Sequence, residues 1–170
     1  MIGVIVFLAI MIIFIIVASL YHIVPWFFGA VFERTQPKTV NNIIILTKPK
    51  KQDKIAELGS GDGEVVIALA KKGAKVDGYE INPILVFISR YRIKKQGLSG
   101  NAKIYWKSFW GVNLSKYNKI VFFQYKTIMQ ELEEKLKKEL KLKSLIISHY
   151  WKFPNWKIKK KIGQVYLYKK

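Results

Sequence analysis

A glycine-rich segment at positions 57–63 holds the residues with the clearest potential for chemistry. It reads Glu-Leu-Gly-Ser-Gly-Asp-Gly, and a short apolar run, Lys54–Leu58, leads into it. Glycines at every second position allow a tight turn and let a ligand approach the backbone. The next residues, 64–72, have a helical pattern, and a helix N-terminus offers free N–H groups. The segment therefore predicts a ligand-binding turn between a strand and a helix.

The spacing of the glycines narrows the class of ligand. A dinucleotide-binding turn reads G-x-G-x-x-G. This turn reads G-x-G-x-G, and Glu64 stands where the third glycine is expected, which argues against NAD as the ligand. No lysine follows as in a phosphate-binding P-loop, and the carboxylates of Glu57 and Asp62 make a poor phosphate cradle. The two carboxylates favour a ligand that carries positive charge.

A further acid follows at a distance typical of ribose binding. Glu80 ends a second predicted strand, Lys75–Glu80, and lies 21 residues after Gly59. A carboxylate at this point can accept hydrogen bonds from both hydroxyls of a ribose. Strand, glycine turn, helix, strand and acid in this order favour a nucleoside-containing ligand over a set of unrelated loop acids.

The elements that must position these residues alternate along the chain. Further strands are predicted at 103–106, 119–123, 145–148 and 164–168, the last paired in a hairpin with 156–162. Helices are predicted at 39–46, 83–96 and 127–141, and Asn82-Pro83 supplies an N-cap and a first-turn proline. This alternation predicts an α/β fold with a Rossmann-like, doubly wound and mostly parallel sheet.

The first 32 residues differ in composition from the rest of the chain. Of these residues 27 are apolar, and all 30 Lys and Arg and all 11 Asp and Glu follow them. A helix over 2–24 is about 34 Å long, enough to cross a hydrocarbon core of about 30 Å. We expect Pro25 to end it and Tyr21, Trp26, Phe27 and Phe28 to lie at the membrane interface. A cleaved signal peptide and a buried core helix are the alternatives. The start carries no basic side chain, as a signal peptide would, and a core helix rarely runs this far without a polar residue.

These patterns predict three parts: a transmembrane anchor with an interfacial segment over 1–32, a connector over 33–52 and a ligand-binding domain over 53–170. The basic residues after the span place the domain on the cytoplasmic side. The net charge of +19 predicts an anionic partner, either membrane lipid, nucleic acid or acidic protein. The chain has no cysteine and only two histidines, which argues against a thiol nucleophile, a catalytic triad or a zinc site.

The glycine turn and the acid after it resemble motif I and the post-I acid of class I S-adenosylmethionine-dependent methyltransferases. More narrowly, residues 37–156 resemble a group of small protein-lysine methyltransferases. This group includes membrane-anchored mitochondrial enzymes that methylate the c subunit of ATP synthase and the adenine nucleotide translocase, and archaeal relatives. The matching features are Thr35-Gln36-Pro37-Lys38, Glu80-Ile81-Asn82-Pro83, Gly97-Leu98-Ser99, Phe109-Trp110 and the segments 131–140 and 148–154.

The resemblance implies a role for each matching residue. S-adenosylmethionine is the implied cofactor, and its ribose is held by Glu80. Its adenine lies beside Ser108 and Phe109, although members of the group often carry an acid where Ser108 stands. The residues implied to hold its methionine end are Glu57, Gly59, Ser60, Gly61, Asp62 and Gly63.

Methyl transfer to an amine mainly requires alignment of the reacting atoms and exclusion of water. A lysine acceptor has a pKa of about 10.4 in water and must be neutral to attack. Desolvation and a nearby sulfonium both favour the neutral amine, so no strong base is needed. The positioning candidates follow the fourth and fifth strands and are Gln124, Tyr125 and Trp151, with His149, Tyr150 and Phe153 beside them; core packing or membrane contact is the alternative for each.

Three functions stay open at this point: a membrane-anchored protein-lysine methyltransferase, a methyltransferase of a lipid or lipophilic small molecule, and a non-catalytic basic adaptor at a membrane surface. A nucleic-acid substrate is disfavoured because no N/D-P-P-Y/F motif follows the fourth strand. The C-terminal segment 150–170 carries seven lysines interleaved with aromatic residues, which predicts a second contact with anionic lipid; a solvated basic surface is the alternative.

Overall fold

The computed structural model describes residues 2–28 and 32–170, and the chain divides into two compact units, Met1–Phe32 and Glu33–Lys170. The first unit contains helix α1 (Ile2–Phe28). Its window Ile2–Ser19 is long and apolar enough to cross a membrane, properties that an N-terminal signal sequence shares. The expected interfacial positions of the aromatic residues at 21 and 26–28 fall on side chains outside the described part.

The sequence predicts that α1 ends at Pro25, but the helix continues to Phe28. Proline removes a single backbone donor, and its fixed φ of about −65° is itself helical. Proline is tolerated inside membrane-spanning helices where neighbouring groups or small local adjustments satisfy the freed carbonyl.

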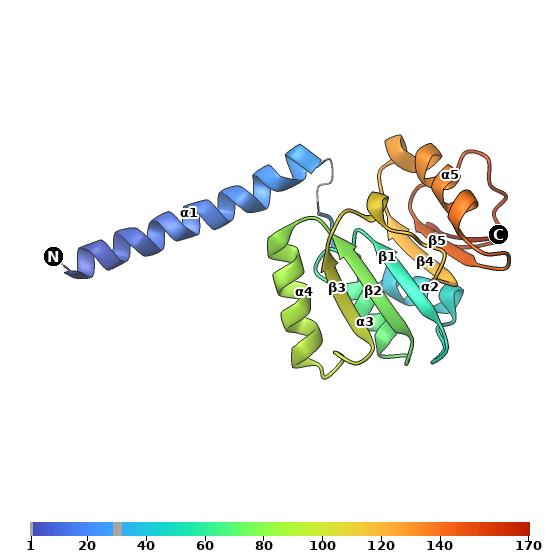
Figure 1. Cartoon of the computed structure of the whole chain (residues 1–170), viewed down its shortest axis with the longest axis horizontal. Helices are drawn as coiled ribbons and strands as arrows, with labels where there is room; N and C mark the ends of the chain where they lie inside the picture. Colours follow the sequence, from blue (N-terminus) through green and yellow to red (C-terminus); the bar gives the residue numbers. More distant parts are fainter. Residues whose placement is uncertain (1, 29–31) are drawn as a thin grey trace. The chain divides into compact units, whose positions relative to one another are not determined.

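A seven-stranded sheet forms the centre of the second unit (Figure 1). The strand order is β3-β2-β1-β4-β5-β7-β6. Neighbours from β3 to β5 are parallel, and β7 runs antiparallel to both β5 and β6. The predicted doubly wound, mostly parallel sheet with its terminal hairpin is therefore confirmed. The strands are β1 (Lys54–Leu58), β2 (Lys75–Glu80), β3 (Ala102–Trp106), β4 (Lys119–Phe123), β5 (Leu145–His149), β6 (Lys160–Ile162) and β7 (Val165–Lys169).

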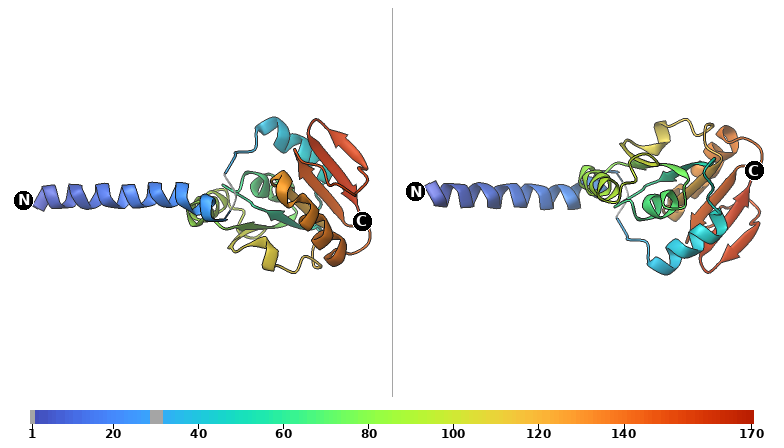
Figure 2. Two further views of the ribbon diagram at one scale, coloured as in Figure 1. Left: turned by 90° about the horizontal axis from the view of Figure 1, so that it is seen from above. Right: turned by 90° about the horizontal axis from the view of Figure 1, so that it is seen from below.

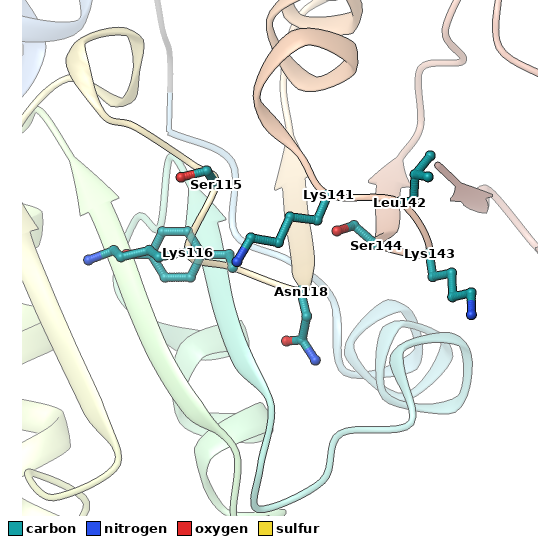
Figure 3. A pocket seen from close by; sticks show the side chains of 8 residues that line it. Ser115, Lys116, Asn118, Lys141, Leu142, Lys143 and Ser144 are labelled. Atoms are coloured by element: carbon teal, nitrogen blue, oxygen red, sulfur yellow. The ribbon is translucent and has the colours of Figure 1, made fainter.

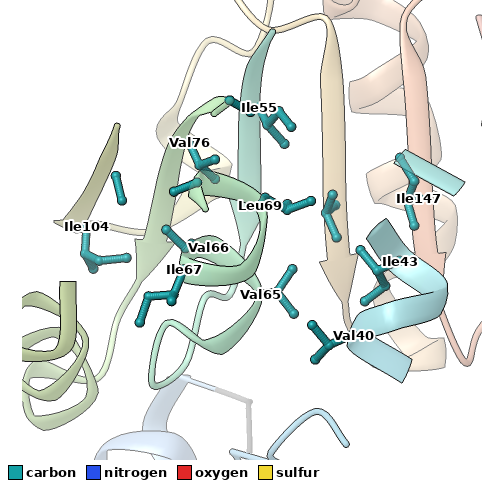
Figure 4. Packing of buried hydrophobic residues seen from close by; sticks show 14 of the residues in the cluster. Val40, Ile43, Ile55, Val65, Val66, Ile67, Leu69, Val76, Ile104 and Ile147 are labelled. Atoms are coloured by element: carbon teal, nitrogen blue, oxygen red, sulfur yellow. The ribbon is translucent and has the colours of Figure 1, made fainter. Parts of the chain in front are cut away.

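Helices cover both faces of the sheet, as the views in Figure 2 show. One core contains residues of α2 (Pro37–Thr47), α3 (Glu64–Ala70) and α4 (Pro83–Lys95), packed on alternate residues of the strands. Figure 4 shows Val40 and Ile43 of this core beside Val65 and Ile147. The other core contains α5 (Met129–Glu139), and two short 3-10 turns, η1 (Phe109–Gly111) and η2 (Lys126–Ile128), complete the unit.

The segment 33–52, expected as a connector with a short helix, falls in the second unit, Glu33–Lys170. Helix α2 contains the predicted short helix, and its Val40, Ile43 and Leu46 are only 7%, 2% and 3% exposed. Their spacing of three residues puts them on one face of the helix, which packs against the sheet. The helix predicted at 127–141 extends only over Met129–Glu139 in the structure, because the 3-10 turn Lys126–Ile128 replaces its start.

The parallel strands place the predicted site residues at one edge. β1 and β2 both end at the carboxyl edge of the sheet, so the glycine turn lies beside Glu80. β4 and β5 end at the same edge, just before Gln124 and Tyr150. At the amino edge, the Nζ atom of Lys119 and the Oδ2 atom of Asp53 form a buried ion pair of 2.6 Å.

Candidate active site

Three glycines shape the turn after β1. Gly59, Gly61 and Gly63 have φ angles of +78°, +52° and +79°, in the left-handed region where a side chain costs free energy. The N–H groups of Gly59 and Ser60 both donate to the carbonyl of Tyr79, which ties the turn to β2. A Cβ on Gly63 would lie 2.8 Å from the Cβ of Ser89, so this glycine also lets α3 approach α4.

Glu57 is buried below this turn in a negative environment. Its Oε2 atom and the hydroxyl of Ser60 have no hydrogen-bond partner in the described part of the chain. Burial raises the pKa of Glu57 well above its usual range, and the charges of Asp62 and Glu80 add to the effect. An unsatisfied buried acceptor costs free energy. These two atoms therefore fit a ligand that brings hydrogen-bond donors or positive charge to the turn.

Glu80 is held in one orientation by backbone donors. Its Oε2 accepts a hydrogen bond of 2.9 Å from the N–H of Gly61, and its Oε1 accepts from Ile81 and Asn82 at 2.9 and 2.8 Å. A carboxylate has about four acceptor sites, so one site remains on Oε2 for a ligand hydroxyl. Asn82 then caps α4, as predicted, by accepting from the N–H of Ile84 at 3.0 Å.

Asp62 is engaged by two arginines that sequence reasoning missed. Its Oδ2 lies 2.9 Å from a guanidinium nitrogen of Arg34 and 2.7 Å from one of Arg92. Arg92 also donates to the carbonyl of Asp62 at 2.9 Å and pairs with Glu64. The two arginines lie 28 and 30 residues from Asp62, and no motif links such positions. Their charges neutralise the turn and attach it to α4.

The structure brings Ser108 and Phe109 to the same end of the sheet as Glu80. The N–H of Lys107 donates to the carbonyl of Glu80 at 3.0 Å. Ser108 is exposed and accepts from the N–H of Trp110 at 3.4 Å, which starts the turn η1. The ring of Phe109 packs on that of Trp110, with 4.9 Å between the centroids. Contact of both residues with an adenine stays a prediction.

Gln124 is the positioning candidate that lies against the glycine turn. It is buried, and its Nε2 donates to the carbonyl of Leu58 at 2.9 Å. A Cβ at Gly59 would lie 2.4 Å from this nitrogen. The glycine at position 59 therefore leaves room for the Gln124 amide, and the end of β4 is fixed to the end of β1.

The remaining aromatic candidates separate into exposed and buried ones. Tyr125 is 43% exposed, and Trp151 is half-buried with the Nζ of Lys126 6.0 Å from its ring centroid. Phe153 is only 5% exposed and packs on Phe122, so it is a core residue rather than a site residue. Catalytic roles for Gln124, Tyr125 and Trp151 stay predictions.

His149 lies next to this group, at the end of β5. Its ring lies 4.3 Å from that of Phe123, and burial lowers its pKa, although the charge of Glu33 opposes this effect. Burial at this position therefore favours the neutral imidazole. Tyr150 follows with φ of +72°, a strained value for a tyrosine, at the sharp turn after the strand.

A pocket at the amino edge lies away from these residues (Figure 3). Its walls come from the segments before β4 and β5 and include Ser115, Lys116, Lys141 and Ser144. The glycine turn and Glu80 are at the opposite ends of the strands, so this pocket is not the candidate active site.

Comparison with known proteins finds a matching family and several relatives of this chain. The family described as the ANTKMT methyltransferase domain matches residues 57–160. The human lysine N-methyltransferase of the ATP synthase c subunit is 40% identical over 119 residues, which are 70% of this chain and 51% of that protein. A protein-lysine N-methyltransferase of Saccharolobus islandicus is 31% identical over 130 residues, covering 75% of this chain and 81% of that protein.

A solved structure has the same fold. The RNA methyltransferase of Salinibacter ruber, in complex with S-adenosyl-L-homocysteine, superposes with a TM-score of 0.77 at 24% identity. The alignment covers 81% of this chain and 93% of that one. The class I methyltransferase fold expected from the sequence is therefore confirmed. The chain spans about half the length of the vertebrate relatives that it matches.

Proposed function

The chain belongs to the ANTKMT methyltransferase domain family, and we propose that it is an S-adenosylmethionine-dependent protein-lysine N-methyltransferase that acts at a membrane. The observation that carries this proposal is the glycine turn with Glu57 buried below it and Glu80 fixed beside it. The relatives support a lysine acceptor, because both are named lysine methyltransferases.

The cofactor site is the turn itself. When bound, S-adenosylmethionine supplies a methyl group on a positively charged sulfonium. The unsatisfied oxygen of Glu57 and the hydroxyl of Ser60 are placed to meet donors of its methionine end. Glu80 offers its remaining acceptor site to the ribose. The carboxylate of Glu80 accepts backbone N–H groups and, unlike those of Asp62 and Glu64, forms no ion pair with an arginine in the described part of the chain, which suits a ligand that carries positive charge.

The acceptor side of the site is formed by the segments after β4 and β5. Gln124 presents a side-chain amide next to the turn, Tyr125 follows it, and Trp151 follows β5 at the same edge of the sheet. Aromatic faces stabilise ammonium and sulfonium groups. A lysine that enters here loses water, which lowers its pKa and favours the neutral amine that attacks. The neutral form of His149, which burial favours, adds no charge that would repel it.

Action at a membrane is inferred from α1, which has the length and composition of a membrane span. Because all basic residues follow it, the positive-inside rule places the domain on the cytoplasmic side of a single-pass anchor. Arg34, just after the anchor, contacts Asp62 of the glycine turn. Arg34, near the start of the domain unit, thus lies at the carboxyl edge of the sheet beside the cofactor turn.

Labelling of host membranes with tritiated S-adenosylmethionine tests the acceptor class. Membranes that contain the full chain are incubated with the cofactor and then extracted with organic solvent. We expect the label to stay in the protein fraction, and to be lost when the chain carries the Glu80→Ala substitution. Label in the extracted lipid instead would favour the alternative of a lipid methyltransferase.

The orientation has its own test. The chain has no cysteine, so Lys51→Cys, at an exposed position, introduces a single thiol. This thiol should resist an impermeant reagent in intact cells and react after lysis. Reaction in intact cells would reverse the orientation and leave the enzymatic proposal intact.

A further inference from the structure

Helix α4 carries a second apolar stripe that faces away from the protein. Its inward face is buried against the sheet and consists of Leu85, Val86, Ser89 and Ile93. The outward stripe consists of Ile84, Phe87, Ile88 and Tyr91, which recur at i, i+3, i+4 and i+7. Of these, Phe87 is 73% exposed, Tyr91 59% and Ile88 36%. A surface helix that packs on one side only is expected to be polar on this face.

The grouping of these residues on one helix face distinguishes them from scattered apolar residues on a surface. Single exposed apolar side chains are common and need no explanation, but a contiguous group on one helix marks an interaction surface. Trp106 extends the apolar area towards the start of α4. It is 65% exposed, and its indole N–H donates to the carbonyl of Ile81 at 2.9 Å.

The charges on α4 indicate the chemistry of what binds there. The last turn is basic, and the helix contains no acidic residue. Arg92 points to Asp62, whereas Lys94 and Lys95 are exposed at the end of the apolar stripe. Apolar and aromatic residues bordered by lysines are typical of helices that lie in the interface of an anionic bilayer.

A short tether in the sequence, residues 29–33, links α1 to Arg34 of the domain. Arg34 follows Phe28, where α1 ends, by only six positions. A fully extended chain of that length spans about 20 Å at most. Arg34 and Arg92 of α4 contact the same oxygen of Asp62, at 2.9 and 2.7 Å. The tether therefore joins the domain one ion pair away from α4.

The C-terminal lysine segment, which the sequence predicts as a lipid contact, buries three of its aromatic rings in the domain. Phe153 and Tyr166 are each 5% exposed and Tyr168 is fully buried, so these aromatic rings belong to the core. Tyr150 is 44% exposed, and Trp151 and Trp156 are half-buried, so lipid contact of this segment stays a prediction. The more exposed aromatic residues, Phe87 and Tyr91, are on α4.

We propose that the outward face of α4, formed by Ile84, Phe87, Ile88 and Tyr91 with Lys94 and Lys95, docks on the anionic headgroup layer of the membrane that holds α1. The proposal rests on the anchor described under the proposed function. Docking would fix the carboxyl edge of the sheet near the bilayer surface, because α4 begins at that edge, directly after Glu80 and Asn82. The favoured acceptor is then a lysine at the headgroup level of a membrane protein.

Spin labelling of the full chain in liposomes tests the docking. Because the chain lacks cysteine, Ile88→Cys, Ile12→Cys and Leu142→Cys each give one labelled position. The label at position 12 reports on α1, and the label at position 142, which is 81% exposed before β5, is a matched control away from α4. Collision with oxygen and with a water-soluble relaxant is compared in phosphatidylcholine vesicles with and without phosphatidylglycerol.

We expect the label at Ile12 to be immersed in both lipids, that at Leu142 to stay in water, and that at Ile88 to become immersed with anionic lipid. Phe87→Glu with Tyr91→Glu should return position 88 to water, whereas Leu142→Glu should not. Lys94→Gln or Lys95→Gln should lower the ratio of docked to undocked protein roughly fivefold each.

An aqueous label at Ile88 beside an immersed label at Ile12 would overturn the docking and leave the anchor in place. An aqueous label at Ile12 would overturn both the membrane anchor and the docking of α4. Immersion of Ile88 that survives the double glutamate substitution would also contradict the proposed face. The labels report on the membrane without methyl transfer, so failure of the enzymatic proposal would not alter these results.

Discussion

Arg34 and Arg92 bind the same carboxylate oxygen of Asp62, at 2.9 and 2.7 Å. The two contacts differ in exposure, because the side chain of Arg34 is 64% exposed and that of Arg92 only 24%. The pair joins three segments, the residues after α1, the glycine turn and α4. It explains how a turn that contains three left-handed glycines is held in one shape.

This difference predicts unequal effects of the two arginines. Arg92→Ala should lower the free energy of unfolding by about 1.5–3 kcal/mol, since it removes partly buried bonds to charged groups. Arg34→Ala should cost at most about 1 kcal/mol, as an exposed ion pair does. Urea unfolding of the full chain in mild detergent, followed by tryptophan fluorescence, gives both values. Equal losses of unfolding free energy in the two variants would contradict the larger role of Arg92 in holding the turn.

Glu57 should lower the stability of the ligand-free protein and strengthen cofactor binding. Because burial raises the pKa of Glu57 in the folded state, the folded protein binds more protons than the unfolded chain above the ordinary value of 4.5. Stability then falls as the pH rises from that value. Glu57→Gln should remove this decline, raise the melting temperature of the ligand-free protein at pH 8 and weaken cofactor binding.

Melting temperatures of both proteins between about pH 5 and 8 check this expectation. Calorimetric titration with S-adenosylmethionine completes the comparison. A glutamine variant that melts below the wild type throughout this range would contradict the account of Glu57 as an unsatisfied buried acid.

Glu80→Ala should weaken S-adenosylmethionine binding by about 1.5–3 kcal/mol, the usual loss for hydrogen bonds to a charged group. Glu139→Ala is a matched control, since the Glu139 carboxylate also accepts a backbone N–H, from Leu114 at 2.7 Å, but on α5. Calorimetry should show lower affinity only for the Glu80 variant. Unchanged affinity, or a preference for NAD, would remove the ribose role of Glu80.

Much of this fold could be predicted from the sequence, because its signals are local. The alternation of apolar strands and helices indicates the sheet, and Asn82-Pro83 marks the start of α4. The order of Glu57, the glycines and Glu80 is enough to locate the turn. These features depend on neighbours within a few residues or on one strand-helix-strand unit.

Other features arise only from tertiary packing. The pairing of Asp62 with Arg34 and Arg92 joins residues about 30 positions apart, and the contact of Gln124 with Leu58 spans 66. The burial of α2 could not be predicted, because its apolar spacing alone does not say what it packs against. The aromatic residues of β7 alternate with other residues in a way that does not distinguish core from surface, and only their position beside β5 settles it.

Mass spectrometry of membrane proteins after incubation with the full chain and S-adenosylmethionine tests the central claim most directly. We expect new methyl groups on the Nζ atom of lysine in a membrane protein, and their absence with the Glu80→Ala variant in otherwise identical membranes. The Glu139→Ala variant should methylate the same lysine. Methyl groups on another acceptor, or equal lysine methylation with Glu80→Ala, would contradict the assignment of this site to protein-lysine methylation.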